Sequence, residues 1–389
     1  MPIPTHCSNP NCRHFENPPA RWRVRFGSYE TRAHGTVQRY RCTACGKTFG
    51  DQTESMHYYA KRRLPLKAVS TTLTGGSSMR EVATRYRISP ATVQNAILRL
   101  GRQAMISHLH LLDTMPPHSN VAFDGLRSFV TSQDYPCDIT TVVSTKGEMV
   151  LTMTHSITRR GGTMTAKQAR RCRKKYAVWS PPTGAVKKAI SLVCREILDY
   201  ARYTFSDPIT IDTDEHPVYR SILKNNRCFR HLRKAKKMKH FRTSGNAPRT
   251  VDNRLFPVNY VDRLLRHREK EHTRETIAFG RHGAVQMHRA WIFGWNHNCV
   301  RPWREKQVTS GSHAECAGVS PQQIRRLSAS FYNRRQRVTH QAVPDSIREA
   351  FLAEIATPPV RWKKGQKGTT VRVPQYAVRD LLAAISTKF

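Results

Sequence analysis

Two carboxylates at the ends of predicted strands constrain most strongly what this chain can fold into. Asp124 ends an apolar run in Val-Ala-Phe-Asp, and Asp214 ends a β-branched run in Ile-Thr-Ile-Asp-Thr-Asp. A third acid, Asp262, lies in a charged run that we expect to be helical. In a strongly basic chain, carboxylates kept at strand ends are best explained by divalent metal, for which oxygen atoms are the preferred ligands.

The charge of the chain predicts a polyanionic partner. Its 66 Lys and Arg residues outnumber 27 Asp and Glu residues, which gives a formal net charge of +39 that is spread from end to end. Nucleic acid is the partner we expect. An anionic membrane is the alternative, but no apolar run approaches the roughly 18–20 residues of a spanning helix. The first residues lack the apolar core of a signal peptide, so we expect a cytoplasmic, nucleoid-associated protein without a membrane anchor.

Two cysteine pairs near the N-terminus predict a structural metal site. Cys7 and Cys12 form one pair, Cys42 and Cys45 form the other, and a strand-like segment separates them. Four thiolates in this spacing are typical of a tetrahedral Zn²⁺ site in a zinc ribbon, and a module this small depends on the metal for its fold. His14 is an alternative ligand, but we expect it at the surface.

A helix-turn-helix is predicted next. Ser78 and Glu81 have the spacing of a capping box, and Ser89-Pro90 has the residues of a second helix start. The second helix would enter the major groove of duplex DNA, and an ordinary helical hairpin is the alternative. The side chains expected to contact DNA on this helix are those of Gln94, Asn95 and Arg99.

Residues 115–305 predict a mixed α/β layer, with the three acids converging at one edge of its sheet. The predicted strands are 120–130, 138–144, 148–157, 208–213 and a last short strand at Cys228–Arg233, and the main helices are 186–203 and 262–275. A basic run containing Arg230 and Lys234 predicts a DNA-backbone contact, with a solvated loop as the alternative. The predicted domains are a zinc ribbon (1–55), a helix-turn-helix (60–105), a catalytic core (115–305) and a basic C-terminal extension (306–389).

This combination resembles the DDE-type transposases of small bacterial insertion sequences over roughly residues 5–300. That family has a ribonuclease H-like core with its first acid on the first strand, like Asp124. Its second acid follows the fourth strand as Thr-Asp with a nearby tyrosine, like Asp214 and Tyr219. Its third is a glutamate in an Asn-x-x-Glu-Arg helix, which here reads Asn259-Tyr-Val-Asp262-Arg.

The resemblance implies a two-metal enzyme that cuts DNA at the ends of an element and joins them to target DNA. It implies that Asp124, Asp214 and Asp262 hold two Mg²⁺ or Mn²⁺ ions, and that the protein is a homo-oligomer, a dimer or larger. Asp262 is one methylene shorter than the family's glutamate. Asn259, one turn earlier on the same helix face, is therefore a second candidate for the third ligand.

Other interpretations of these residues stay open at this point. Asp212 lies two residues before Asp214 on the same side of a strand, and Asp262 has the spacing of a solvated pair with Arg266. For the whole chain, the alternatives are a non-catalytic, transposase-derived DNA-binding regulator and a metal nuclease without strand transfer.

Overall fold

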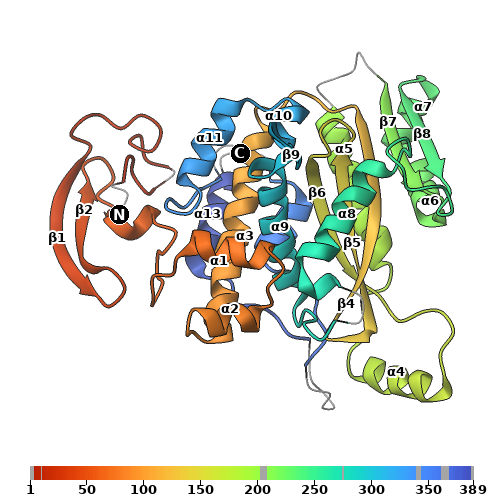
Figure 1. Ribbon diagram of the computed structural model, residues 1–389. Helices are drawn as coiled ribbons and strands as arrows, with labels where there is room; N and C mark the ends of the chain where they lie inside the picture. The colour runs from red at the N-terminus through yellow and green to blue at the C-terminus, as the bar shows by residue number, and fades with distance from the viewer. Residues whose placement is uncertain are drawn as a thin grey trace.

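The computed structural model describes residues 4–9, 11–201, 208–273, 276–338, 343–360 and 368–386. A β-hairpin near the N-terminus lies at one end of the molecule, helices fill the centre, and a larger sheet lies at the other end (Figure 1). The hairpin strands are β1 (Arg23–Thr31) and β2 (Gly35–Cys42), and β3 (Thr48–Gly50) pairs with β2. Trp22 stacks on Phe49 beside three of the cysteines, so the apolar core of this module is very small.

Three helices follow, and the predicted caps are confirmed. They are α1 (Leu66–Thr74), α2 (Met79–Arg85) and α3 (Pro90–Leu112). Ser78 Oγ accepts a hydrogen bond from the Glu81 backbone N–H at 3.2 Å, and Ser89 Oγ accepts one from Thr92 N–H at 3.2 Å. The last of these helices is longer than predicted, because its C-terminal half is buried against α9 (Gly283–Cys299).

The larger sheet has five strands in the order β6-β5-β4-β7-β8. Strands β6, β5 and β4 pair antiparallel, whereas β7 and β8 run parallel to β4. The bounds are β4 (Asn120–Val130), β5 (Ser132–Ser144), β6 (Val150–Ile157), β7 (Ile209–Asp214) and β8 (Met238–Thr243). A mixed α/β layer preceded by a four-cysteine module is therefore confirmed.

The last strand predicted from the sequence, Cys228–Arg233, is wrong. These residues lie in helix α7 (Arg227–Lys234), and the strand begins at Met238. The Asn226 side chain accepts hydrogen bonds from the Cys228 and Phe229 backbone N–H groups, and this cap starts the helix. Phe229 and Leu232, three residues apart, then pack on the helix face that meets the core.

Helices cover both faces of the sheet. One face packs against α5 (Ala185–Ala201) and α6 (Pro217–Asn225), and the other against α8 (Phe256–Arg268) and α9. Because side chains alternate along a strand, Asp124 shares its side of β4 with Ala122 and Leu126, which belong to the core on the α8 side. The strand direction thus points Asp124 toward the helix that carries Asp262.

Helix α4 (Ala166–Val178) stands away from the sheet on an insertion between β6 and α5 (Figure 1). Ion pairs with the buried carboxylate of Asp134 on β5 hold this helix to the sheet. Arg171 Nε lies 2.7 Å and Lys175 Nζ 2.8 Å from the Asp134 Oδ2 atom. The remaining charges of the helix, among them Lys167, Arg170, Arg173 and Lys174, are exposed.

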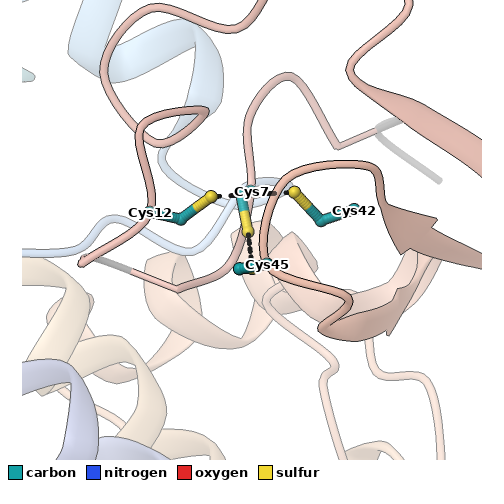
Figure 2. Close-up of side chains that lie close together, drawn as sticks. All are labelled: Cys7, Cys12, Cys42 and Cys45. Atoms are coloured by element: carbon teal, nitrogen blue, oxygen red, sulfur yellow. Dashed lines mark hydrogen bonds between the residues drawn. The ribbon is translucent and has the colours of Figure 1, made fainter.

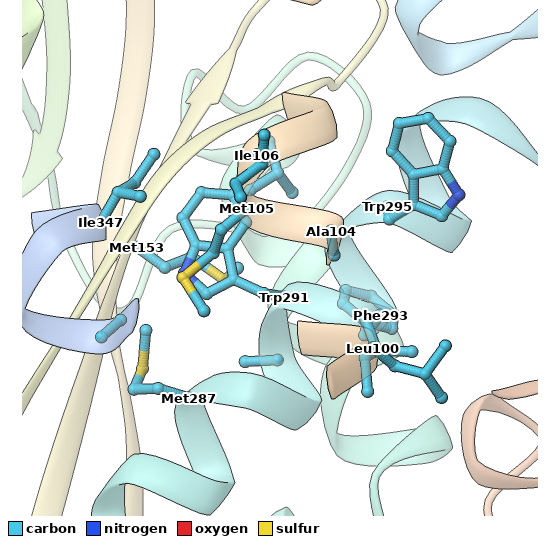
Figure 3. Close-up of a cluster of buried hydrophobic side chains, with 14 of the residues drawn as sticks. Leu100, Ala104, Met105, Ile106, Met153, Met287, Trp291, Phe293, Trp295 and Ile347 are labelled. Atoms are coloured by element: carbon cyan, nitrogen blue, oxygen red, sulfur yellow. The ribbon is translucent and has the colours of Figure 1, made fainter. Parts of the chain in front are cut away.

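The C-terminal third packs into the main core. Trp291 of α9 lies among Met105 of α3, Met153 of β6 and Ile347 of α12 (Asp345–Phe351) (Figure 3). The domain division proposed from the sequence stays a prediction. This core contains residues from both sides of the boundary predicted between residues 305 and 306. In the described residues, no helix is long and apolar enough to cross a membrane. The remaining elements are η1 (Asp51–Glu54), η2 (Lys270–His272), β9 (Pro302–Arg304), β10 (Gln307–Ser312), α10 (His313–Ala317), α11 (Pro321–Ser330) and α13 (Gln375–Ser386).

Candidate functional site

The four N-terminal cysteines form a compact group. Within the described part of the chain, Cys7, Cys12, Cys42 and Cys45 are the one set of three or more His, Cys, Asp or Glu residues whose ligand atoms all lie within 4.8 Å of one another. The Sγ atoms of Cys7 and Cys45 are 3.5 Å apart, and those of Cys12 and Cys42 are 3.7 Å apart (Figure 2). Four converging thiols on two short loops are compatible with a structural Zn²⁺.

His14 does not lie at the surface, so that expectation is wrong. Its side chain is only 6% exposed, and its Nδ1 atom lies 3.6 Å from Cys42 Sγ. The backbone N–H groups of His14 and Asn9 each donate to a cysteine sulfur at 3.4 Å. Such N–H···S bonds orient metal-ligating thiolates, so His14 supports the group from beside it.

Asp124 and Asp214 stand where two strands diverge. The parallel pairing of β4 with β7 ends at Ala122 and Asp212, and each acid lies two residues beyond that last pair. Asp212 itself is buried and accepts a hydrogen bond from Arg254 at 3.0 Å, so its carboxylate is committed to an ion pair. Of the two candidates on β7, Asp214 is the acid at the open end.

The Asp124 carboxylate is held in place by its neighbours. Its Oδ1 atom accepts a hydrogen bond from Gly125 N–H at 2.7 Å and one from the Tyr219 hydroxyl at 3.4 Å. Burial raises the pKa of Asp124 to about 6, and the negative charges of Asp214 and Asp138 add to the rise. Asp214 Oδ1 in turn accepts a hydrogen bond from His216 N–H at 2.8 Å.

Asp262 of α8 faces the same region. Burial raises its pKa well above the usual range, and the charge of Asp124 is the next largest cause. Its Oδ1 atom is shielded from solvent and has no hydrogen-bond partner among the described residues. This is not the environment of a solvated surface pair with Arg266. Asn259 lies one turn earlier on α8 and is half-buried.

One acid of this cluster was not singled out from the sequence. Asp138 of β5 is buried opposite Arg127 of β4, and it contributes to the raised pKa values of Asp124 and Asp262. Its Oδ1 accepts a hydrogen bond from Thr140 at 3.0 Å. The available signal was a charged residue inside the otherwise apolar and β-branched strand Cys-Asp-Ile-Thr-Thr-Val-Val.

The Asp138 carboxylate fills the space that a side chain at position 125 would occupy, so this position requires glycine. A Cβ atom on residue 125 would lie 2.4 Å from Asp138 Oδ2. We therefore expect Gly125→Ala to lower the free energy of unfolding by about 1–3 kcal/mol, as overpacking of a filled site does. Chemical denaturation measures the change. Gly161→Ala, where no atom lies within 4 Å, is the matched control and is expected to change it little. Equal effects of the two substitutions would show that Asp138 does not fill this space.

The raised pKa of Asp124 has a consequence for stability. The folded protein holds this proton up to about pH 6, whereas an unfolded aspartate releases it near 3.8. Stability therefore falls as the pH rises through that window, and above it the charged carboxylate costs on the order of 2 kcal/mol. We expect Asp124→Asn to raise the melting temperature at pH 7.5 in chelator, and to do so much less at pH 4.

The exposed Asp252 gives the matched control for this measurement, because Asp252→Asn removes the same charge outside the cluster. It is expected to leave the melting temperature nearly unchanged at both pH values. A stabilisation by Asp124→Asn of the same size at pH 4 and pH 7.5 would argue against a destabilising charge at Asp124.

The residues predicted to contact DNA lie on two helices. Asn95 is exposed and Gln94 half-buried on α3, whereas Arg99 donates to the carbonyl oxygens of Met56 and Tyr58 at 3.2 and 2.7 Å. The Arg99 side chain is thus engaged within the protein. Arg230 and Lys234 are both exposed, one turn apart on α7. Comparison of the chain with protein-family models and with curated protein sequences gives no match.

Proposed function

We propose that this protein is a metal-dependent DNA transposase whose sheet and flanking helices form a ribonuclease H-like core. The order β6-β5-β4-β7-β8, with the first three strands antiparallel and the last two parallel to β4, agrees with that expectation. So does an acid on the first strand of the sheet, an acid at the end of the fourth and an acid on a late helix.

The observation that carries the proposal is the electrostatic coupling of acids far apart in the chain. The charge of Asp214 contributes to the raised pKa of Asp124, and the charge of Asp124 contributes to that of Asp262. All three charges contribute to the raised pKa of Tyr219. Negative charges gathered in this way oppose folding unless a cation compensates them. Buried carboxylates that repel one another are costly, and groups with strongly perturbed pKa values gather at functional sites.

Carboxylate oxygens are the donors that a hard divalent cation prefers. In the structure the ligand oxygens of Asp124, Asp214 and Asp262 do not all lie within 4.8 Å of one another, so a cation that binds all three would draw them closer together. Among the described residues, the buried Asp262 Oδ1 atom has no hydrogen-bond partner, and a bound cation would compensate it. Mg²⁺ or Mn²⁺, when bound, would activate water or a 3′-hydroxyl and stabilise the leaving oxygen of a phosphodiester. Asp124, Asp214 and Asp262 would hold it, with Asn259 as the second candidate for the third position.

The neighbours of the acids fix their orientation. The Tyr219 hydroxyl and the Gly125 N–H hold Asp124, and the His216 N–H holds Asp214. The Oδ1 atoms of Asp124 and Asp214 are thus hydrogen-bonded at the ends of rigid strands. Little side-chain entropy therefore remains to be lost when a cation and a DNA phosphate bind. We assign no covalent nucleophile, because hydrolysis and transfer by a 3′-hydroxyl need none.

The DNA would be bound mainly through its phosphates. The exposed cations of α7 and α4, among them Arg230, Lys234 and Arg170, offer sequence-independent contacts. Preference for the ends of an element would come from the cysteine module and from α2 and α3, with Gln94 and Asn95 as base contacts. The protein would act in the cytoplasm on the nucleoid, as a homodimer or a larger oligomer.

The direct test is DNA cleavage by the purified full-length chain. We expect nicking of supercoiled plasmid that carries the DNA flanking the coding region, only when Mg²⁺ or Mn²⁺ is present. Joining of a pre-cut 3′ end to target DNA distinguishes a transposase from a nuclease without strand transfer. Tight DNA binding without cleavage under either metal would favour the non-catalytic regulator instead.

A further inference from the structure

A basic cavity of about 880 Å³ lies apart from the acid cluster, between the cysteine module and the helices. Its walls come from the turn after β1, the segment 57–66, the first half of α3 and residues 372–376 near the C-terminus. The His34 side chain contacts the His57 carbonyl at 3.3 Å, which ties the hairpin turn to this segment. The cavity is therefore built by elements that are far apart in the sequence.

The lining carries an uncompensated positive charge. Among the described residues that line the cavity there is no aspartate or glutamate. Positive charge that lines a concave surface without a carboxylate focuses the field on an anionic ligand. The cations of the lining are Arg32, Lys61, Arg62, Arg99, Arg102 and Arg372.

Arg102 is the most deeply buried of these cations. It is 6% exposed, and its Nε donates to the Phe351 carbonyl at 3.4 Å. Within the described ranges, its Nη2 atom has no hydrogen-bond partner. Burial lowers its pKa to about 10, and no carboxylate is among the charges that act on it. Arginines this deeply buried are normally paired with an acid. Arg102 instead lies beside an open cavity of like charge.

An aromatic side chain completes the cavity. Tyr59 is 68% exposed, and its backbone has a φ of +55°, a left-handed conformation that costs a non-glycine residue free energy. Its ring stacks on Tyr376 with centroids 6.1 Å apart and planes 18° apart. The Tyr58 ring also lies beside it, with centroids 4.4 Å apart. The large part of the Tyr59 ring that these two neighbours leave exposed offers a surface on which a planar ligand can stack.

We propose that this cavity binds unpaired nucleotides of a DNA strand. Aromatic faces bordered by cations bind single strands, because each base can stack while its phosphate meets a basic side chain. A cavity of this volume suits small groups such as one or two nucleotides.

This inference rests on the proposed function for its ligand, DNA, but not on the acid cluster. A DNA end that is opened or cut would leave unpaired nucleotides beside the helices that hold the flanking duplex. The cavity would hold such a strand through Tyr59 and the surrounding arginines. It would therefore favour frayed or overhanging ends over intact duplex.

The experiment compares two fluorescent DNAs by anisotropy with the full-length, zinc-loaded chain. One is a blunt duplex, and the other is the same duplex with a short 3′ oligothymidine tail. We expect the tail to lower Kd by about tenfold or more, since stacking of one base on an aromatic ring is worth about 1–3 kcal/mol. Equal Kd values for the two DNAs would overturn the proposal.

Substitutions at Tyr59 test the location. Tyr59→Asn removes the ring but accepts the left-handed backbone, so the fold is preserved. It is expected to abolish the gain from the tail and to leave the Kd of the blunt duplex unchanged, whereas Tyr59→Phe keeps the gain. Arg372→Gln should reduce the gain and its dependence on salt. If Tyr59→Asn still binds the tailed DNA more tightly than the blunt duplex, the unpaired strand binds elsewhere on the protein.

Parallel cleavage assays separate the two proposals. If the protein binds duplex and cleaves it with metal but shows no preference for the tailed DNA, the cavity proposal is wrong and the proposed function is unaffected. A tail preference that depends on Tyr59, in a protein that cuts no DNA, would do the reverse.

Discussion

Asp124→Asn is expected to abolish metal-dependent DNA cleavage and to leave DNA binding intact or slightly tighter. The substitution keeps the shape of the side chain, including an oxygen for the Gly125 and Tyr219 hydrogen bonds, and removes only the charge. Losing a metal-bound carboxylate removes several kcal/mol of transition-state stabilisation, which corresponds to a rate loss on the order of 10³-fold or more. Single-turnover cleavage in Mg²⁺ and anisotropy in chelator measure the two effects separately.

The same substitution at Asp262 decides the third ligand. If Asp262 holds the metal, Asp262→Asn should be as severe as Asp124→Asn, and Asn259→Ala should be milder. Asp262→Glu restores the residue of the family that the chain resembles and is expected to retain most of the activity. The opposite pattern, with Asn259→Ala inactive and Asp262→Asn normal, would assign the third ligand to Asn259.

Asp252→Asn is the control for these variants, because it removes an exposed carboxylate from the loop that precedes α8. It should cut DNA at the rate of the parent protein. Should the variants at positions 124, 214 and 262 all cut as well as this control, the acids are not catalytic. The protein would then be better described as a DNA-binding regulator.

The elements governed by local chemistry are the ones that sequence patterns predicted well. The Ser78 capping box and the Ser89-Pro90 helix start depend on residues within four positions of each other, and both are as expected. Strand β4 has the bounds that the sequence predicted, Asn120–Val130. The position of Asp124 was therefore accessible from the sequence, as was the grouping of the four cysteines.

What depends on tertiary contacts was missed. Asp138 joins the acid cluster only through the register of β4 against β5, which places it opposite Arg127 and beside Gly125. Arg99 stays a predicted DNA contact, but the sequence did not indicate that its guanidinium donates hydrogen bonds to the carbonyl groups of Met56 and Tyr58. The α7 segment was misassigned as a strand because six residues of mixed character do not distinguish the two periods.

Removal of the thiolates is expected to unfold the N-terminal module while the rest of the protein stays folded. Beyond the cysteines, the core of this module holds little more than Trp22 and Phe49, with Tyr40 at its edge. Apparent binding free energies of structural zinc are about 10–16 kcal/mol, far more than two or three aromatic contacts supply. We expect the parent chain to hold one Zn²⁺ and the Cys42→Ser, Cys45→Ser double variant to hold none, by elemental analysis.

Limited proteolysis shows where that variant loses its fold. Cleavage should become fast within residues 11–50 and stay slow from α1 onward, because the helices pack against α9. Residues 53–55 should also stay protected, because they bond to Arg334 and Arg335. Cys228→Ser is the matched control, since Cys228 is an exposed free thiol on α7. Full zinc occupancy in the double variant would refute the four-cysteine assignment. Zinc loss without faster proteolysis would mean that Trp22 and Phe49 suffice to hold the hairpin, and the metal would then be a ligand of the module and not its main support.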